Sequence, residues 1–125
     1  MADLPEIHAG FPSPAADYMS GVIDLNRELV RHPESTFYGR VVGDSMADAD
    51  VHEGDVLVID KSLTPAEGDM VVCFLDGEFC LKYISRRPDG LWLLPGNARY
   101  KPIPVPEGAD FVPWGVVTYV IRKLR

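Results

Sequence analysis

The sequence predicts a mainly β protein, with one antiparallel β domain, a short N-terminal helix and an extended N-terminal arm. Beyond Pro33, short runs of branched and aromatic residues follow one another closely. Pairs of glycine and aspartate separate these runs, and no helical pattern alternates with them, which argues against a wound α/β sheet. The expected strands cover residues 36–42, 56–59, 70–75, 79–84, 91–94 and 111–121.

The N-terminal part of the chain is predicted to contain an arm and a helix. Residues 1–14 carry three prolines and little periodicity, so we expect a flexible arm there and a single domain over residues 15–125. Within that domain, apolar residues recur at nearly helical spacing up to Val30. Asp24 is a suitable N-cap, and a short helix over residues 24–31 is expected before Pro33.

A hairpin is predicted between the third and fourth expected strands, because Asp76-Gly77 is a strong signal for a two-residue turn. This turn sets the register, so that Cys73 faces Cys80 and Val71 faces Lys82. Alternation then places Lys82 beside apolar residues, where its ammonium is poorly solvated. The two cysteines are close enough for a disulfide, but we expect reduced thiols that fill the core.

The segment Gly43-Asp44-Ser45-Met46 follows the first expected strand, where a serine hydroxyl can enter a cleft. The backbone N–H groups of Asp44 and Ser45 are the candidate oxyanion donors. Lysine can activate a serine if desolvation keeps part of its amine neutral, which makes Ser45 and Lys82 a candidate dyad. Spacing alone does not separate this dyad from a turn serine and a solvated lysine. The Gly-x-Ser-x-Ala pattern disfavours an α/β-hydrolase.

Composition excludes several classes of function. The chain has 125 residues and is 46% hydrophobic, which suits one compact domain. Its net charge of −7 opposes direct, nonspecific DNA binding. Direct, specific DNA binding is not expected either. No apolar run is long enough to span a membrane, and no signal peptide is recognisable, so we expect a cytoplasmic protein. The histidines and cysteines lack metal-ligand spacing, so neither a metal site nor another cofactor is expected.

The run Ala9-Gly10-Phe11-Pro12-Ser13-Pro14-Ala15-Ala16-Asp17-Tyr18 matches a known family together with three other motifs: Gly43-Asp44-Ser45-Met46, Asp76-Gly77-Glu78-Phe79 and Lys82. The chain closely resembles the UmuD family over nearly its whole length. That family is related to the self-cleaving domains of LexA and phage repressors. The resemblance implies a LexA/UmuD-like fold and an autoproteolytic serine peptidase that cuts the Ala9–Gly10 bond, with Ser45 as nucleophile and Lys82 as base.

The resemblance also implies a role and partners. Cleavage would be stimulated by a RecA filament on single-stranded DNA during the SOS response. The shortened protein would form a homodimer and associate with a UmuC-type translesion DNA polymerase. The apolar run at 111–121 favours a homodimer as well, unless that strand lies wholly inside the domain.

Three alternatives are considered. A LexA-like or phage-repressor-like transcriptional regulator would need a DNA-binding helix-turn-helix, and the nine residues before the presumed cut are too few to encode one. Nine residues also make a shorter arm than is usual for the UmuD family, which bears on how cleavage is regulated. A signal-peptidase-like enzyme would call for a membrane anchor. An inactive polymerase-binding module would keep the β fold without the chemistry.

Overall fold

The structure is a computed structural model that describes Leu4, residues 7–10 and residues 23–125. The chain divides into two compact units, residues 1–31 and residues 32–125. The predicted boundary between an arm at 1–14 and a domain from residue 15 lies outside the described residues, as does the apolar pattern between residues 15 and 22. No helix in the described part of the chain is long and apolar enough to cross a bilayer.

The predicted helix is present as α1, Leu25–Leu29, and is confirmed in position but shorter than expected. The Asp24 carboxylate caps it by accepting a hydrogen bond from the backbone N–H of Arg27 at 3.2 Å. Val30 has already left the helix with ψ of 100°. A 3₁₀ helix, η1 at Pro33–Ser35, follows and leads into the sheet.

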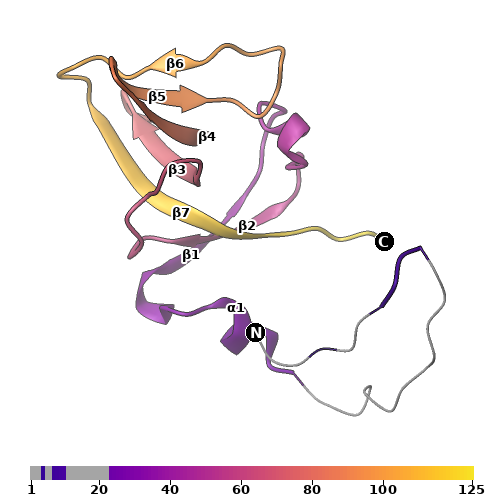
Figure 1. Ribbon diagram of the computed structural model, residues 1–125. Coiled ribbons are helices and arrows are strands. Elements are labelled where there is room, and N and C mark those ends of the chain that lie inside the picture. The colour runs from indigo at the N-terminus through magenta and orange to yellow at the C-terminus, as the bar shows by residue number, and fades with distance from the viewer. Residues whose placement is uncertain (1–3, 5–6, 11–22) are drawn as a thin grey trace. The chain divides into compact units, whose positions relative to one another are not determined.

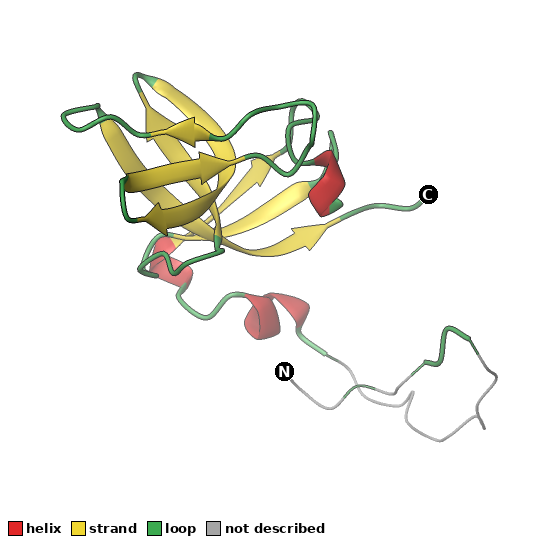
Figure 2. Ribbon diagram, turned by 45° about the horizontal axis from the view of Figure 1, so that its top comes forward, coloured by secondary structure: helices red, strands yellow, loops and turns green. Residues whose placement is uncertain are grey.

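The remainder of the chain forms a seven-stranded sheet in which every recorded pairing is antiparallel, and this confirms the predicted fold class. Figures 1 and 2 show a strongly curved sheet with one long strand running through it. The spatial order is β1-β2-β7-β3-β4-β5-β6. The strands are β1 (Thr36–Arg40), β2 (Val56–Asp60), β3 (Met70–Leu75), β4 (Glu78–Arg87), β5 (Gly90–Leu94), β6 (Ile103–Pro104) and β7 (Phe111–Ile121).

The hairpin of β3 and β4 has the predicted register, with Cys73 opposite Cys80 and Val71 opposite Lys82. Asp76 and Gly77 both have positive φ, at 50° and 87°, as a tight two-residue turn of this kind requires. The hairpin therefore fixes where Lys82 lies in the sheet from local sequence alone.

Two irregularities bend the central strand β7. Its register against β3 shifts between Val72 and Cys73, which leaves Trp114 as the extra residue. A second shift, against β2, leaves Thr118 as the extra residue. Such bulges increase local twist and re-aim side chains, and a bulge is also where a central strand tolerates a proline such as Pro113.

Two apolar clusters form the core. The first cluster packs the loop after β1 against β2. The second cluster lies around the β3–β4 hairpin. The first consists of Val41, Met46, Val51, Leu57 and Ile59, and the second of Val71, Cys73, Ile84, Leu93 and Val116. The first cluster includes Met46, the neighbour of the candidate nucleophile, and so anchors that part of the site.

Candidate active site

Ser45 lies in the long connection between β1 and β2, which contains the 3₁₀ helix η2 at Ala47–Ala49. The connection is closed at its base by hydrogen bonds from the N–H of Val41 to the carbonyl of Asp55 and from the N–H of Gly54 to the carbonyl of Val41, each 2.9 Å. The two ends of this loop are therefore held together by hydrogen bonds.

Arg122, just beyond β7, clamps this loop. Its guanidinium binds Asp55 through two hydrogen bonds, of 2.8 and 2.6 Å, and also donates to the backbone carbonyl of Asp50 at 2.8 Å. A hydrogen bond from Arg122 holds the pKa of the Asp55 carboxyl well below its usual range. This planar, two-point pairing fixes the C-terminal half of the loop against the end of the sheet.

Ser45 is half-buried and is followed by Met46, which is only 2% exposed. Met46 thus fixes the turn from inside the domain, while Asp44 on the other side faces solvent. Within the described residues, the N–H groups of Asp44 and Ser45 donate no backbone hydrogen bond. They are therefore available to an acceptor outside the fold, as oxyanion donors must be.

Lys82, on β4, has a buried side chain with an exposed fraction of 9%. It lies on the hairpin side shared with Val71, Cys73 and Ile84, as the register predicts. Among the residues that the structure describes, no carboxylate pairs with Lys82 and no hydrogen bond joins its amine to Ser45. The dyad as such thus remains a prediction.

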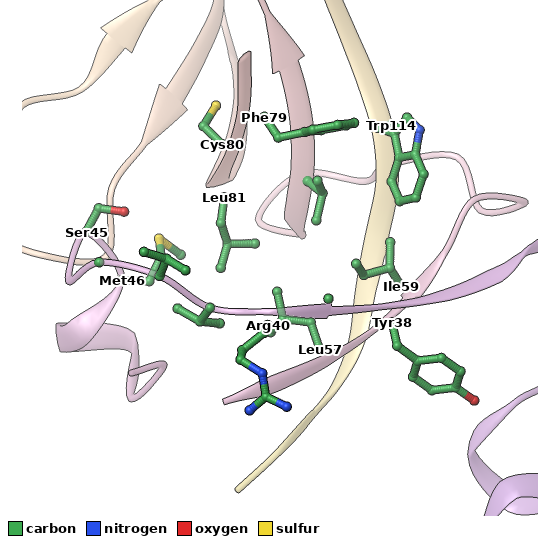
Figure 3. A pocket seen from close by; sticks show the side chains of 15 residues that line it. Tyr38, Arg40, Ser45, Met46, Leu57, Ile59, Phe79, Cys80, Leu81 and Trp114 are labelled. Carbon is green, nitrogen blue, oxygen red and sulfur yellow. The ribbon is translucent and has the colours of Figure 1, made fainter. Parts of the chain in front are cut away.

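An apolar groove of about 600 Å³ has Ser45 in its wall. Figure 3 shows the Ser45 hydroxyl at one end of the groove, with Phe79 and Trp114 toward the other. These aromatic rings are in edge contact, with centroids 5.6 Å apart. The bulge in β7 gives Trp114 its place in this wall, and sequence reasoning missed both rings as site residues. The sequence signal for Trp114 was its place next to Pro113, because a proline in a strand favours a bulge.

The two cysteines beside Lys82 are free thiols. Burial raises the pKa of Cys73 to about 12, and it raises the pKa of Cys80 as well. Protonated thiols are weak nucleophiles, so these residues behave as small core groups, as predicted. Cys80 nevertheless borders the groove.

Ala9 and Gly10 are both exposed and lie outside any helix or strand, within the first unit. A Cβ atom built at Gly10 would meet nothing within 4 Å. The peptide bond between them is thus open to an approaching nucleophile.

Comparisons with known proteins point to one family. A family model described as Peptidase S24-like matches residues 3–118. The chain is 45% identical over 117 residues to Protein SamA of Salmonella typhimurium (strain LT2), covering 94% of this chain and 81% of SamA. It is 43% identical over 120 residues to Protein MucA of Escherichia coli, covering 93% and 80%. It is also 40% identical over 121 residues to the LexA repressor of Mycobacterium sp. (strain KMS), covering 97% of this chain and 51% of that repressor.

Proposed function

The chain belongs to the S24-like family of self-cleaving serine peptidases, and we propose that it cuts its own Ala9–Gly10 bond with a dyad of Ser45 and Lys82. The product is a shortened accessory subunit of a translesion DNA polymerase. The observation that carries this proposal is a serine in the wall of an apolar groove, beside backbone N–H groups that no other part of the described chain uses.

The surroundings of Lys82 support its role as base. A lysine can accept a proton only while its amine is neutral. Burial favours the neutral form of a lysine, and an ion pair opposes it. Lys82 is buried and has no carboxylate partner among the described residues. By contrast, the cysteines beside it are kept as thiols and do not compete as nucleophiles.

The reaction proceeds in two stages. Neutral Lys82 takes the proton of the Ser45 hydroxyl while Ser45 Oγ attacks the carbonyl carbon of Ala9. The N–H groups of Asp44 and Ser45 bind the resulting oxyanion. When this intermediate collapses, the Lys82 ammonium returns the proton to the departing amine of Gly10. Water then hydrolyses the ester between Ser45 and Ala9, again with Lys82 as base.

The partners in this proposal follow from the family resemblance. A RecA filament on single-stranded DNA stimulates cleavage in the cytoplasm during the SOS response to DNA damage. The cleaved chain then acts as a homodimer with a UmuC-type translesion polymerase. The net charge of −7 is consistent with protein partners rather than DNA as the direct ligand.

Intact-mass analysis after incubation with RecA, an ATP analogue and single-stranded DNA tests the proposal. We expect a product that begins at Gly10. Ser45→Ala and Lys82→Met should each slow cleavage by roughly a thousand-fold or more, because the members of a catalytic unit act together. Ser35→Ala and Lys123→Met serve as matched controls, because neither residue lines the groove, and both variants should cleave normally.

Two results would contradict the proposal. Cleavage by Ser45→Ala at the original rate would remove Ser45 from the nucleophile role, and a stimulated product with another N-terminus would show that the scissile bond lies elsewhere. If an uncleaved Ser45→Ala protein retained polymerase stimulation, an inactive binding module would be the better description.

A transcriptional repressor is the second candidate, and the 40% identity to a LexA repressor favours it. The match spans about half of that repressor, 51% of its length. Sequence-specific DNA binding by this chain at physiological salt would support repression, and its absence would leave the polymerase role as the better account.

A further inference from the structure

We propose that Asn97 and Tyr100, in the loop that follows β5, are positioning residues that hold Ser45 in place for Lys82. This inference rests on the proposed function of that pair. The loop over residues 95–101 is not part of the groove wall. Both positioning residues act through Asp44, the residue immediately before Ser45.

Asp44 is held by its backbone and by its side chain. The Asn97 side-chain amide donates a hydrogen bond to the Asp44 carbonyl at 2.7 Å, and the Tyr100 hydroxyl donates to the Asp44 carboxylate at 2.6 Å. The bond to Asp44 raises the pKa of Tyr100, which keeps the phenol protonated as a donor. Arg99 approaches the same carboxylate at 3.6 Å, but as an exposed pair it contributes little.

The same loop also holds the residues after Ser45. The N–H of Gly96 donates to Met46 Sδ at 3.2 Å, and the Gly96 carbonyl accepts from the N–H of Asp48 at 2.5 Å. In return, the Asp48 carboxylate accepts from the N–H of Ala98 at 2.8 Å. These bonds flank Ser45 on both sides, and none of them involves its hydroxyl.

The loop after β5 packs closely against the turn that carries Ser45, and only glycine fits at position 96. A Cβ atom at position 96 would lie 2.8 Å from the Cβ of Ala49 and 3.2 Å from the Cα of Met46. Gly96 therefore allows the two backbones to come together at the turn that carries Ser45.

The loop also follows directly after β5, and β5 pairs with β4, the strand that carries Lys82. The last pair between β4 and β5 is Tyr83 with Leu94. Lys82 is the next residue along β4, while Pro95 and Gly96 follow Leu94 on the other strand. Asn97 and Tyr100 thus connect the Lys82 region of the sheet to the Ser45 turn through a short, hydrogen-bonded path.

Thiol alkylation at position 45 measures this positioning. In Ser45→Cys, a Lys82 amine within reach should accept the thiol proton and stabilise the thiolate as an ion pair, which lowers the pH midpoint of reaction with iodoacetamide. The same protein with Lys82→Met should lack that shift. Peptide mapping separates this thiol from Cys73 and Cys80. When Asn97→Ala or Tyr100→Phe is added to Ser45→Cys, at least half of the Lys82-dependent shift in the pH midpoint should disappear. Tyr119→Phe is the matched control, because the Tyr119 hydroxyl makes no hydrogen bond within the described part of the chain, and it should leave the midpoint unchanged.

Cleavage gives a second readout, with wild-type Ser45. Asn97→Ala and Tyr100→Phe should each slow self-cleavage about tenfold, the effect of one lost hydrogen bond to a charged or closely held group, while Tyr119→Phe should not. Circular dichroism checks the fold, and Tyr100→Phe remains informative if Asn97→Ala fails to fold, since it removes a single oxygen.

The outcomes separate this inference from the proposed function. A midpoint that depends on Lys82 but is unchanged by Asn97→Ala and Tyr100→Phe would overturn the positioning role alone. A midpoint that is the same with and without Lys82 would overturn the dyad, and the positioning role with it.

Discussion

Lys82 differs from other cations of the domain in its surroundings. Arg122 is bound by two aspartates, and Lys61 lies over the Trp114 ring with its Nζ 4.7 Å from the ring centroid. Lys82 is buried beside thiols and aliphatic groups, with no such partner among the described residues. A charged lysine is costly to bury without an ion-pair partner, which is consistent with the role as a base that we propose for Lys82.

Asp60 shows the opposite arrangement, a buried carboxylate that is fully satisfied. It is 4% exposed and accepts hydrogen bonds from the Ser62 hydroxyl at 2.6 Å and from the Ser62 N–H at 2.8 Å. The His32 ring nitrogen Nδ1 lies 2.6 Å from its other oxygen. Burial by itself raises the pKa of Asp60, but these bonds outweigh burial and lower the pKa to about 2.

The lowered pKa of Asp60 predicts a loss of stability in acid. The carboxyl has a pKa near ~3.9 in an unfolded chain, so its ionised form stabilises the fold fully above that pH. This contribution should disappear as the pH falls from about 4 to about 2. Asp60→Asn should lower the free energy of unfolding at pH 7 by about 1–3 kcal/mol and flatten its dependence on pH across this range.

Urea unfolding at several pH values checks this prediction. Asp110→Asn is the matched control, because the Asp110 side chain is exposed and has no recorded hydrogen bond in the described part of the chain. Equal pH dependence in Asp60→Asn and the unaltered protein would show that another group carries the acid sensitivity.

At the scale of the elements, β7 organises the domain. It pairs with β2 on one edge and β3 on the other, so it joins the loop that carries Ser45 to the hairpin that carries Lys82. The packing of β7 against β2 is tight at Gly115, where a Cβ atom would lie 2.5 Å from Ile59 Cγ2. The strands can approach this closely only because position 115 lacks a side chain.

This contact predicts different outcomes for two glycine-to-alanine substitutions that face the same isoleucine. Gly115→Ala should lower the free energy of unfolding by about 1–3 kcal/mol, because the β-branched Ile59 cannot move aside without strain. Gly39→Ala on β1 places its methyl carbon 3.4 Å from Ile59 Cδ1, an ordinary contact, and should change stability by less than about 1 kcal/mol. Chemical denaturation of both variants measures the difference. Equal losses would show that the overlap at position 115 is relieved elsewhere.

At the scale of the whole molecule, the apolar content of residues 111–121 has two explanations. The central position of β7 accounts for buried residues such as Val116. It does not account for Val112, Val120 and Ile121, which remain 48%, 38% and 42% exposed. Exposed branched residues on a central strand are consistent with the homodimer that we propose.

Sedimentation equilibrium at low micromolar concentration tests this assembly. We expect a dimer, and Ile121→Asp should shift it toward monomer because a charge would be buried in the interface. Ile103→Asp is the matched control: Ile103 lies on β6 at the edge of the sheet, with a similar exposed fraction of 40%. A monomeric unaltered protein would exclude the dimer, and equal effects of the two substitutions would place the interface away from β7.

The sequence by itself determined the features that depend on neighbours along the chain. The Asp76-Gly77 turn set the register of β3 and β4, and with it the burial of Lys82. Asp24 set the start of α1, and a mainly β fold followed from the run of strand-forming segments. These predictions succeeded because turn geometry and side-chain alternation act over a few residues.

Only the tertiary structure decided what depends on contacts between distant segments. Nothing local to β7 indicates that it lies between β2 and β3, and the two-residue strand β6 is too short to leave a pattern. The hydrogen bonds of Asn97 and Tyr100 to Asp44 join residues 53 and 56 positions apart. Such contacts are selected by the packing of the whole sheet, in which many segments compete for the same partners, and no short window of sequence contains that information.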